Sequence, residues 1–347
     1  MGALKIVHLC TALNRGGAEK ILYQTIVGLS NDFEHEVLLL SYSGPYVELL
    51  LNNGVRVFRF NLTSICRYFF SSRKRIIFHS YLKHTHVLSS IFKFLGFKVV
   101  WSFHGASPFA DSLIDKMVNF LIKIIPNRVS YVSRHCKFVN VKNGASPNKS
   151  CPVDIIYNCV DVSHSSHDLR PDVQINIGIL ARFHPVKNFE LFFSIARNLL
   201  YSNKNYNFIV AGPGCTSQND EIVTLIDRFG LRDSVELLGD LNDTTVFFDK
   251  LDLLISTSKS EAFGLSILEG LASNINVVSF NLPVIDELLP GYNVNLNTNS
   301  VDEMVAFCND KINSPIDSSL SYFILSTYSV KNMILNYKSF YMKVFYA

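Results

Sequence analysis

The chain has 347 residues, more than the roughly 250 to 300 at which one hydrophobic core stops growing, so its length predicts two domains. Hydrophobic residues make up 48% and charged residues only 18%, which excludes an intrinsically disordered chain. The net charge of +3 hides an asymmetry, because residues 1–160 carry 19 Lys and Arg against 8 Asp and Glu, or +11, and the remainder carries −8. The basic half predicts an anionic partner surface, unless the opposite charges only help the two halves dock.

Strands and helices alternate through the first half. The apolar run Leu4 to Cys10 predicts a strand, and the Gly16-Gly17 turn and a helix from Ala18 to Leu29 follow it. Further strands are expected at residues 35–41, 55–60, 76–79, 99–104, 129–133 and 153–157. Helical patterns fill most of the gaps, which implies parallel βαβ units.

A polar stretch from Ser163 to Asp172 predicts the domain boundary. It gives domains at residues 1–162 and 173–329, with a C-terminal helix of about 330–347 that packs back on the first domain. A second alternation then has strands at 175–181, 206–211, 235–238, 253–256 and 277–280, and helices at 189–200, 221–229 and 265–272. The predicted fold class is therefore α/β, with two successive doubly wound domains.

Several classes of protein are disfavoured. The seven cysteines are scattered without a CxxC pair, which argues against a disulfide framework or a zinc site and favours a reducing cytoplasm. No apolar run approaches the roughly 18 residues of a membrane-spanning helix, and the first twenty residues lack a signal-peptide pattern. Nucleic-acid binding is disfavoured because no known module appears and the basic positions fall among long apolar residues.

Two cations follow the first strand of the second half. Arg182 and Lys187 flank the entrance to a helix, where open α/β sheets bind ligands, so they suit a diphosphate. The alternative is a solvated basic pair. Further along, Gly212 lies in a turn after another strand, where the lack of side chains would let a ligand approach closely.

The strongest local signal is a pair of glutamates separated by seven residues. Glu261 lies in a strand-to-helix loop and Glu269 lies about one turn into the helix. Both could face one cleft, with the amides of Phe263, Gly264 and Leu265 exposed between them to anionic oxygens. Glu269, in an otherwise apolar helix, could accept bonds from two vicinal hydroxyls such as those of a ribose. The alternative is a charge that complements the helix dipole plus one surface glutamate.

The first half offers a weaker phosphate signal and a candidate membrane surface. The Gly16-Gly17 turn could meet a phosphate or could simply be a tight turn. Arginines and aromatic residues interleave in the segment 67–75, and Ser112 to Pro126 combines apolar residues with lysines. Such elements suit an anionic membrane interface, with a buried core helix as the alternative for the second segment.

Taken together, these motifs resemble the retaining nucleotide-sugar glycosyltransferases of family 4, which have the GT-B fold. That fold consists of two Rossmann-like domains facing a central cleft. The resemblance spans nearly the whole chain, and its most specific part is the glutamate pair with the two cations. It is carried by Gly16-Gly17, His104-Gly105, Asn158 to Asp161, Arg182 with Lys187, Gly212-Pro213-Gly214, and Glu261 with Glu269.

The resemblance implies a role for each motif residue. Glu269 would bind the donor ribose, Glu261 and the amides after it would bind the donor hexose and its phosphate, and the two cations would bind the diphosphate. His104 would lie beside the transferred sugar, and Gly16 and Gly17 near the phosphates. The sequence departs from the family at Cys159 and Asn188, where glycine is common.

The resemblance also implies substrates and a location. The donor would be a nucleotide-diphosphate sugar, a UDP-sugar first, with no metal ion or other cofactor. The acceptor would be a lipid-linked saccharide in bacterial surface-polysaccharide assembly, such as O-antigen, lipopolysaccharide, capsule or exopolysaccharide. The protein would be cytoplasmic and peripheral on the inner face of the cytoplasmic membrane. The alternatives are a GT-B sugar-nucleotide epimerase and a non-catalytic partner subunit.

Overall fold

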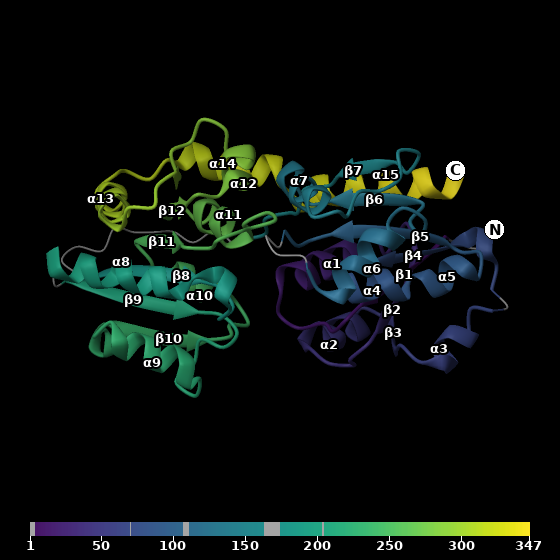
Figure 1. Cartoon of the computed structure of the whole chain (residues 1–347), viewed down its shortest axis with the longest axis horizontal. Coiled ribbons are helices and arrows are strands. Elements are labelled where there is room, and N and C mark those ends of the chain that lie inside the picture. The colour runs from purple at the N-terminus through teal and green to yellow at the C-terminus, as the bar shows by residue number, and fades with distance from the viewer. Residues whose placement is uncertain (1–3, 70, 107–110, 163–173, 203–204) are drawn as a thin grey trace. The chain divides into compact units, whose positions relative to one another are not determined.

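The computed structural model describes residues 4–347 except 70, 107–110, 163–173 and 203–204 (Figure 1). The chain divides into two compact units, residues 1–159 together with 330–347, and residues 160–329. The stretch Ser163 to Asp172, in which the sequence predicts the boundary, lies outside the described residues. Each unit is a parallel sheet covered by helices, so the predicted pair of doubly wound α/β domains is confirmed.

The first unit is built on a seven-stranded parallel sheet. Its strands are β1 (Lys5–Cys10), β2 (Glu34–Leu39), β3 (Arg56–Arg59), β4 (Ile76–Ser80), β5 (Lys98–Phe103), β6 (Arg128–Tyr131) and β7 (Val153–Ile155). They lie in the order β3-β2-β1-β4-β5-β6-β7. The order reverses direction between β1 and β4, and at such a switch point the carboxyl ends of the strands leave a crevice for ligands.

The helices of this unit cover both faces of the sheet. They are α1 (Gly17–Gly28), α2 (Pro45–Asn52), α3 (Leu62–Cys66), α4 (Lys83–Leu88), α5 (Ser90–Phe94), α6 (Leu113–Leu121), α7 (Arg134–Lys142) and α15 (Val330–Tyr346). Right-handed crossovers from β1 to β3 run in one direction and those from β4 to β7 in the other. Helices α1 and α2 therefore lie on one face, and α4 to α7 lie on the opposite face.

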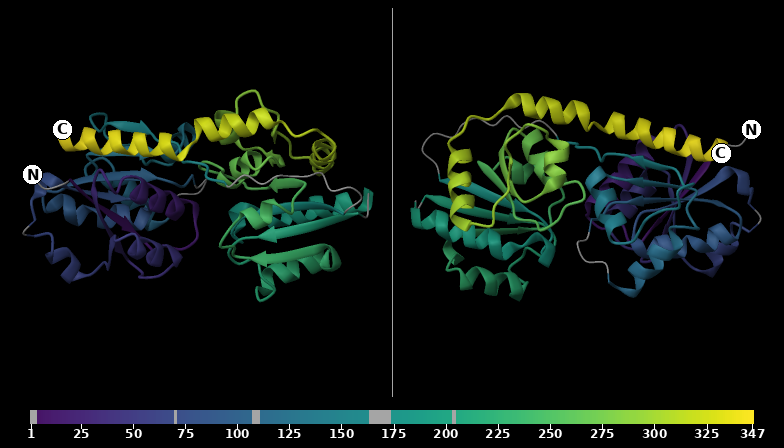
Figure 2. Two further views of the ribbon diagram at one scale, coloured as in Figure 1. Left: turned by 180° about the vertical axis from the view of Figure 1, so that it is seen from behind. Right: turned by 45° about the horizontal axis from the view of Figure 1, so that its top comes forward.

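The last helix of the chain, α15, completes the core of the first unit. Met333, Tyr337, Phe340 and Tyr341 of α15 are buried with side chains of β1, α1, β4 and β5. The helix lies along the sheet of this unit in both views of Figure 2, where it is the yellow helix that ends at the C-terminus. Residues from the far end of the sequence thus cover the same sheet face as α1.

The second unit repeats the topology with six strands. These are β8 (Ile175–Leu180), β9 (Tyr206–Ala211), β10 (Val235–Gly239), β11 (Leu253–Ser256), β12 (Asn276–Phe280) and β13 (Asn295–Leu296), in the order β10-β9-β8-β11-β12-β13. Its helices are α8 (Phe189–Ser202), α9 (Asp220–Arg228), α10 (Thr245–Phe248), α11 (Leu265–Ala272), α12 (Pro283–Leu288), α13 (Val301–Ile312) and α14 (Ser318–Thr327). The switch point lies between β8 and β11.

Candidate functional site

The candidate site of the second unit lies at the carboxyl ends of two neighbouring strands. Strands β8 and β11 pair directly, and each ends in a loop that carries predicted site residues. The loop after β8 holds Arg182 and Lys187, and the loop after β11 holds Glu261 and leads into α11. Because parallel strands present their carboxyl ends at one edge, both loops border the switch-point crevice.

An ion pair joins these two loops. The Nζ atom of Lys187 lies 2.5 Å from Oε1 of Glu261, and the Ser258 hydroxyl donates to the same oxygen at 2.7 Å. The Thr257 hydroxyl donates to the backbone carbonyl of Lys187 at 2.9 Å. Both charged side chains are largely shielded from solvent, at 23% and 14% exposure. The sequence predicts all the charged members but not their pairing, nor the part that Ser258 and Thr257 take in it.

Asn188 and Cys159, which replace glycines common in family 4, adopt backbone conformations that their residue types allow. Asn188 has φ of 53°, in the left-handed region, and asparagine tolerates that region better than most residues. Cys159 does not have a positive φ, and its buried thiol donates to Oε1 of Gln24 at 3.0 Å. Neither departure therefore distorts its turn.

Helix α11 begins at a glycine whose conformation few other residues adopt. Gly264 is the N-cap with φ of 79°, and a Cβ there would lie 3.0 Å from Cδ1 of Ile285. Within the described residues, the N–H groups of Leu265 and Ser266 donate to no protein acceptor. These amides and the positive end of the helix dipole suit an anion. The Phe263 side chain is buried, with its ring centroid 5.6 Å from that of Tyr328.

The second glutamate of the motif is a buried residue. Glu269 lies in the middle of α11 and is only 6% exposed. A surface glutamate, which is the alternative interpretation of this position, is therefore wrong. Buried carboxylates need polar partners, and Glu269 has an interaction within the chain, so its contact with a donor stays a prediction.

The remaining donor-site candidates differ in their surroundings. Arg182 is exposed and forms no ion pair among the described residues. Gly212 has φ of 130°, and a Cβ there would lie 2.2 Å from the carbonyl oxygen of Ala181. This close contact between two loops explains the glycine without a ligand, so its role in donor binding stays a prediction.

In the first unit, the Gly16-Gly17 turn precedes α1 at the end of β1. A Cβ at position 16 would lie 2.3 Å from Oε2 of Glu19, so the carboxylate of Glu19 lies against this glycine. The N–H of Gly16 donates to the carbonyl of Asn14 at 3.0 Å. The chain's own carboxylate thus lies at the helix N-terminus where the sequence predicts a phosphate contact, and that contact stays a prediction.

His104 follows β5 at the same sheet edge. Both ring nitrogens are shielded from solvent and have no hydrogen-bond partner within the described part of the chain. Burial lowers the pKa of His104 to about 4, so the ring is neutral at physiological pH. Its ring centroid lies 5.5 Å from that of Tyr81, which follows β4. A neutral imidazole with two unused nitrogens is suited to bind a hydroxyl-bearing ligand.

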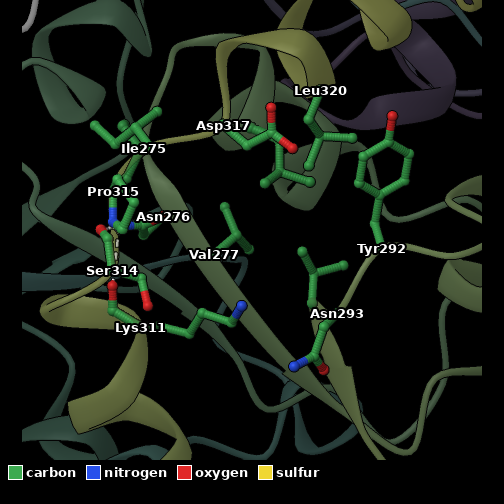
Figure 3. A pocket seen from close by; sticks show the side chains of 13 residues that line it. Ile275, Asn276, Val277, Tyr292, Asn293, Lys311, Ser314, Pro315, Asp317 and Leu320 are labelled. Carbon is green, nitrogen blue, oxygen red and sulfur yellow. Dashed lines mark hydrogen bonds between the residues drawn. The ribbon is translucent and has the colours of Figure 1, made fainter.

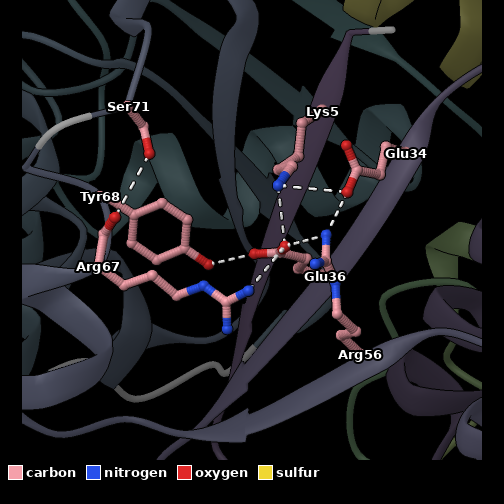
Figure 4. A network of polar contacts seen from close by, with 7 residues as sticks. All are labelled: Lys5, Glu34, Glu36, Arg56, Arg67, Tyr68 and Ser71. Carbon is pink, nitrogen blue, oxygen red and sulfur yellow. Dashed lines mark hydrogen bonds and ion pairs between the residues drawn. The ribbon is translucent and has the colours of Figure 1, made fainter. Parts of the chain in front are cut away.

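The basic and aromatic segment 67–75 exposes only part of the side chains that predict a membrane interface, and membrane contact through it stays a prediction. Tyr68 is buried, and its hydroxyl donates to Glu36 at 2.6 Å (Figure 4). Arg67 approaches the same carboxylate at 3.9 Å and lies over the Phe58 ring. Burial alone would raise the pKa of Glu36, but hydrogen bonds and nearby cations outweigh it and lower that pKa. The expectation that Tyr68 faces the membrane is therefore wrong, and Phe70 lies outside the described residues.

A small pocket of about 110 Å³ in the second unit lies away from these loops. It is bordered by the start of β12 and the chain before α14, and the Lys311 side chain reaches toward it (Figure 3). No predicted site residue lines it. Across the described ranges, no three His, Cys, Asp or Glu side chains are grouped as a metal site requires. Metal independence stays a prediction.

The family model described as "Glycosyl transferases group 1" matches residues 166–309, which include every donor-site candidate of the second unit. The match lies within the second unit and covers less than half of the chain. The chain is 26% identical over 303 residues to a human phosphatidylinositol N-acetylglucosaminyltransferase subunit, covering 80% of this chain and 61% of the relative. It is 29% identical over 148 residues to the O-antigen biosynthesis glycosyltransferase WclY of Escherichia coli, covering 40% of each. The chain thus spans less than two thirds of these relatives' lengths.

Solved structures extend the similarity in fold to both units of the chain. HepE of Anabaena, solved in complex with UDP and glucose, superposes with a TM-score of 0.83 at 18% identity, covering 98% of this chain and 100% of that one. TarM superposes with a TM-score of 0.78 at 13% identity, covering 99% of each chain. The predicted GT-B fold is therefore confirmed.

Proposed function

We propose that the protein is a retaining, metal-independent glycosyltransferase. It moves a hexose or N-acetylhexosamine from a nucleotide-diphosphate sugar to a hydroxyl of a lipid-linked glycan in polysaccharide biosynthesis. The first candidate for the donor is a UDP-sugar. The observation that carries the proposal is the Lys187–Glu261 contact at the switch point of the unit that the group 1 model matches, beside the start of α11. The complexes of HepE with UDP and with UDP-glucose are consistent with this choice of donor.

The two cations have different tasks in this proposal. Lys187 already shares its charge with Glu261, whereas Arg182 is exposed and lacks an ion pair in the described part of the unit. Arg182 therefore supplies the larger unbalanced charge for the diphosphate. Lys187 holds Glu261 in place and offers its remaining N–H donors to a phosphate oxygen.

The carboxylates and helix amides bind the rest of the donor. Glu269 accepts hydrogen bonds from the two ribose hydroxyls, which fits a carboxylate buried within an otherwise apolar helix. Glu261, held by Lys187 and Ser258, accepts from hydroxyls of the hexose. The N–H groups at the start of α11 face the phosphates, with Phe263 and Gly264 shaping that turn.

In the transfer, the bond from the anomeric carbon to the phosphate oxygen breaks and a bond to the acceptor oxygen forms on the same face of the sugar. The acceptor proton moves to the departing phosphate. Leaving-group stabilisation is the main catalytic task, and losing one such group typically costs on the order of 2.7 to 4 kcal/mol. His104 contacts a hydroxyl of the transferred sugar through its neutral ring.

The acceptor and location rest on the first unit. Its excess of basic residues and its exposed apolar side chains favour an acceptor held at an anionic membrane, on the inner face of the cytoplasmic membrane. No helix in the described residues is long and apolar enough to cross a membrane. The WclY match supports O-antigen or lipopolysaccharide assembly as the setting.

The test is a screen of sugar nucleotides by thermal shift, followed by product analysis with and without a lipid-linked acceptor. A ligand at 100 times its Kd adds about 2.7 kcal/mol of stability. The wild type should respond to one donor, Glu269→Gln should respond weakly, and Glu221→Gln, an exposed glutamate of α9, should respond as wild type. Donor stabilisation that is unchanged in Glu269→Gln, or sugar conversion without any acceptor, would contradict the proposal.

A further inference from the structure

The outer sides of α6 and α7 expose an unusual number of large apolar residues. Four of them follow one stripe along α6 and the turn after it, at spacings of four, three and four residues, and two more lie on α7. Phe120 is 64% exposed and Phe138 is 62% exposed. The α6–α7 surface is defined by these six side chains, Leu113, Met117, Phe120, Ile124, Phe138 and Val141.

The two helices are neighbours in the fold. They lie on the same face of the sheet because the crossovers from β5 to β7 run in one direction. The Nδ2 atom of Asn119 in α6 donates to the carbonyl of Asn143, directly after α7, at 2.8 Å. A shallow groove of about 380 Å³ runs along α7 and is lined by Arg134, Lys137, Phe138, Val141 and Lys142. Its lining combines two apolar and three basic side chains.

The charged residues around this surface are mainly basic, with one exposed carboxylate, Asp111, just before α6. Its exposed basic residues are Lys116, Lys123, Arg134, Lys137 and Lys142. The only acidic residue within the two helices is Asp115, which is buried and ion-paired with Lys83. Exposed apolar groups surrounded by cations match the acyl boundary and the headgroups of an anionic bilayer.

We propose that the α6–α7 surface docks the protein on an anionic lipid bilayer. This proposal rests on the proposed function in one respect, because docking would bring the site to a lipid-linked acceptor. The aromatic and aliphatic side chains enter the acyl boundary while the lysines and Arg134 remain at the headgroups. A second copy of the chain is a poorer occupant, because a two-fold contact would bring basic rims together. The segment 67–75 is also poorer, since Tyr68 is buried against Glu36 and Phe69 is the one exposed aromatic side chain among its described residues.

The experiment is flotation of the full chain with vesicles of phosphatidylcholine alone or mixed with phosphatidylglycerol. The wild type should bind the mixed vesicles, and high salt should release part of it. Each basic residue near an anionic leaflet contributes about fivefold in affinity, so Lys137→Gln with Lys142→Gln should weaken binding roughly thirtyfold. Phe120→Ser with Phe138→Ser should weaken it by about tenfold or more and remove the salt-resistant fraction.

Matched control variants test whether vesicle binding depends on this surface or only on the total charge and the exposed apolar area of the unit. Leu62→Ser removes a side chain that is 76% exposed on α3, and Lys74→Gln with Lys331→Gln removes two exposed cations elsewhere on the same unit. These controls should bind more strongly than the corresponding α6–α7 variants. Equal losses in controls and test variants, or a wild type that ignores anionic vesicles, would overturn the proposal. A wild-type dimer that is lost only in the α6–α7 variants would also overturn it. So would a wild type that binds an acidic protein through this surface but binds no anionic vesicle.

Donor binding keeps this test separate from the proposed function. Sugar-nucleotide thermal shifts, measured without vesicles, should be the same in wild type and in the α6–α7 variants, whose overall thermal unfolding checks their folding. A chain that docks through this surface but responds to no sugar nucleotide would contradict the proposed function and leave the docking proposal standing.

Discussion

Acid should destabilise the first unit strongly, because its core holds several neutral histidines. Burial lowers the pKa of His86 to about 3 and that of His35 and His104 to about 4. The pKa values of His8 and His79 lie well below 6.5, first because of burial and then because other histidines lie nearby. His8 and His79 hydrogen-bond Tyr81 and Tyr341, respectively, so the folded unit keeps these rings neutral.

The direction in which pH changes the free energy of unfolding follows from proton uptake by the unfolded chain. With folded pKa values below an unfolded value near 6.5, stability is unaffected at pH 8 and falls as the pH drops through 6.5. One such histidine costs roughly 1 to 2 kcal/mol at pH 5.5, and five together cost about 7 kcal/mol. A domain has only about 5 to 15 kcal/mol in total, so the first unit should be near unfolding there. The lowered pKa values of Glu36 and Asp115 act only below their ordinary values of 4.5 and 3.8.

The single tryptophan reports on this unit. Trp101 is buried in β5, and its ring stacks on His86 with centroids 4.6 Å apart. Urea unfolding followed by its fluorescence should give a free energy about 7 kcal/mol lower at pH 5.5 than at pH 8. His86→Phe keeps an aromatic stack and should reduce that difference by roughly 1 to 2 kcal/mol, whereas the exposed His84→Phe should not change it. Equal unfolding free energies at the two pH values would refute the reasoning.

Three further changes test other parts of the structure. Arg182→Ala should lower kcat more than it raises KM and leave stability unchanged, whereas Lys187→Ala should also lower the unfolding free energy because it leaves the shielded Glu261 carboxylate without its cation. Steady-state kinetics and urea titrations measure these effects, and equal stability of the two variants would contradict the distinction. Gly212→Ala should cost more stability in thermal unfolding than Gly230→Ala, since both have positive φ but only position 212 lacks space for a Cβ, and a smaller loss at 212 would be contrary. Tyr68→Phe should cost about 1.5 to 3 kcal/mol in urea titrations without changing vesicle binding, and weakened vesicle binding would restore it as a membrane residue.

Local patterns were enough to predict the main strands of both sheets and the place of the candidate donor-site loops, but not the two-residue strand β13. Each main strand is a short apolar run between turn residues, and in parallel sheets such runs locate the edge where ligands bind. The pairing of Lys187 with Glu261 was not predictable, because 74 residues separate them and no local pattern encodes their contact. Tyr68 shows the same limit, since it belongs to a segment with an amphipathic pattern but is itself buried against Glu36, 32 residues away.

Helix α6 was ambiguous for another physical reason. Val118 and Ile122 are buried while Met117 and Phe120 are exposed, so apolar residues occupy more than one side of this segment. A sequence with apolar residues on several sides of a helix is compatible with a core helix and with a helix at a membrane interface. Only packing against the sheet and α4 decides which side remains exposed, and that packing involves distant parts of the sequence.

The position of α15 also changes the meaning of the charge asymmetry. With residues 330–347 assigned to the first unit, that unit has 22 Lys and Arg against 8 Asp and Glu, or +14, and the second unit has 10 against 21, or −11. An anionic leaflet therefore attracts the first unit and repels the second, so the charge alone favours contact through the unit that carries the α6–α7 surface. The cations Arg182 and Lys187 then act as a local exception within an acidic unit. Since the Debye length is about 8 Å at physiological salt, an anionic donor bound as proposed would sense these cations more strongly than the acidic surface farther away.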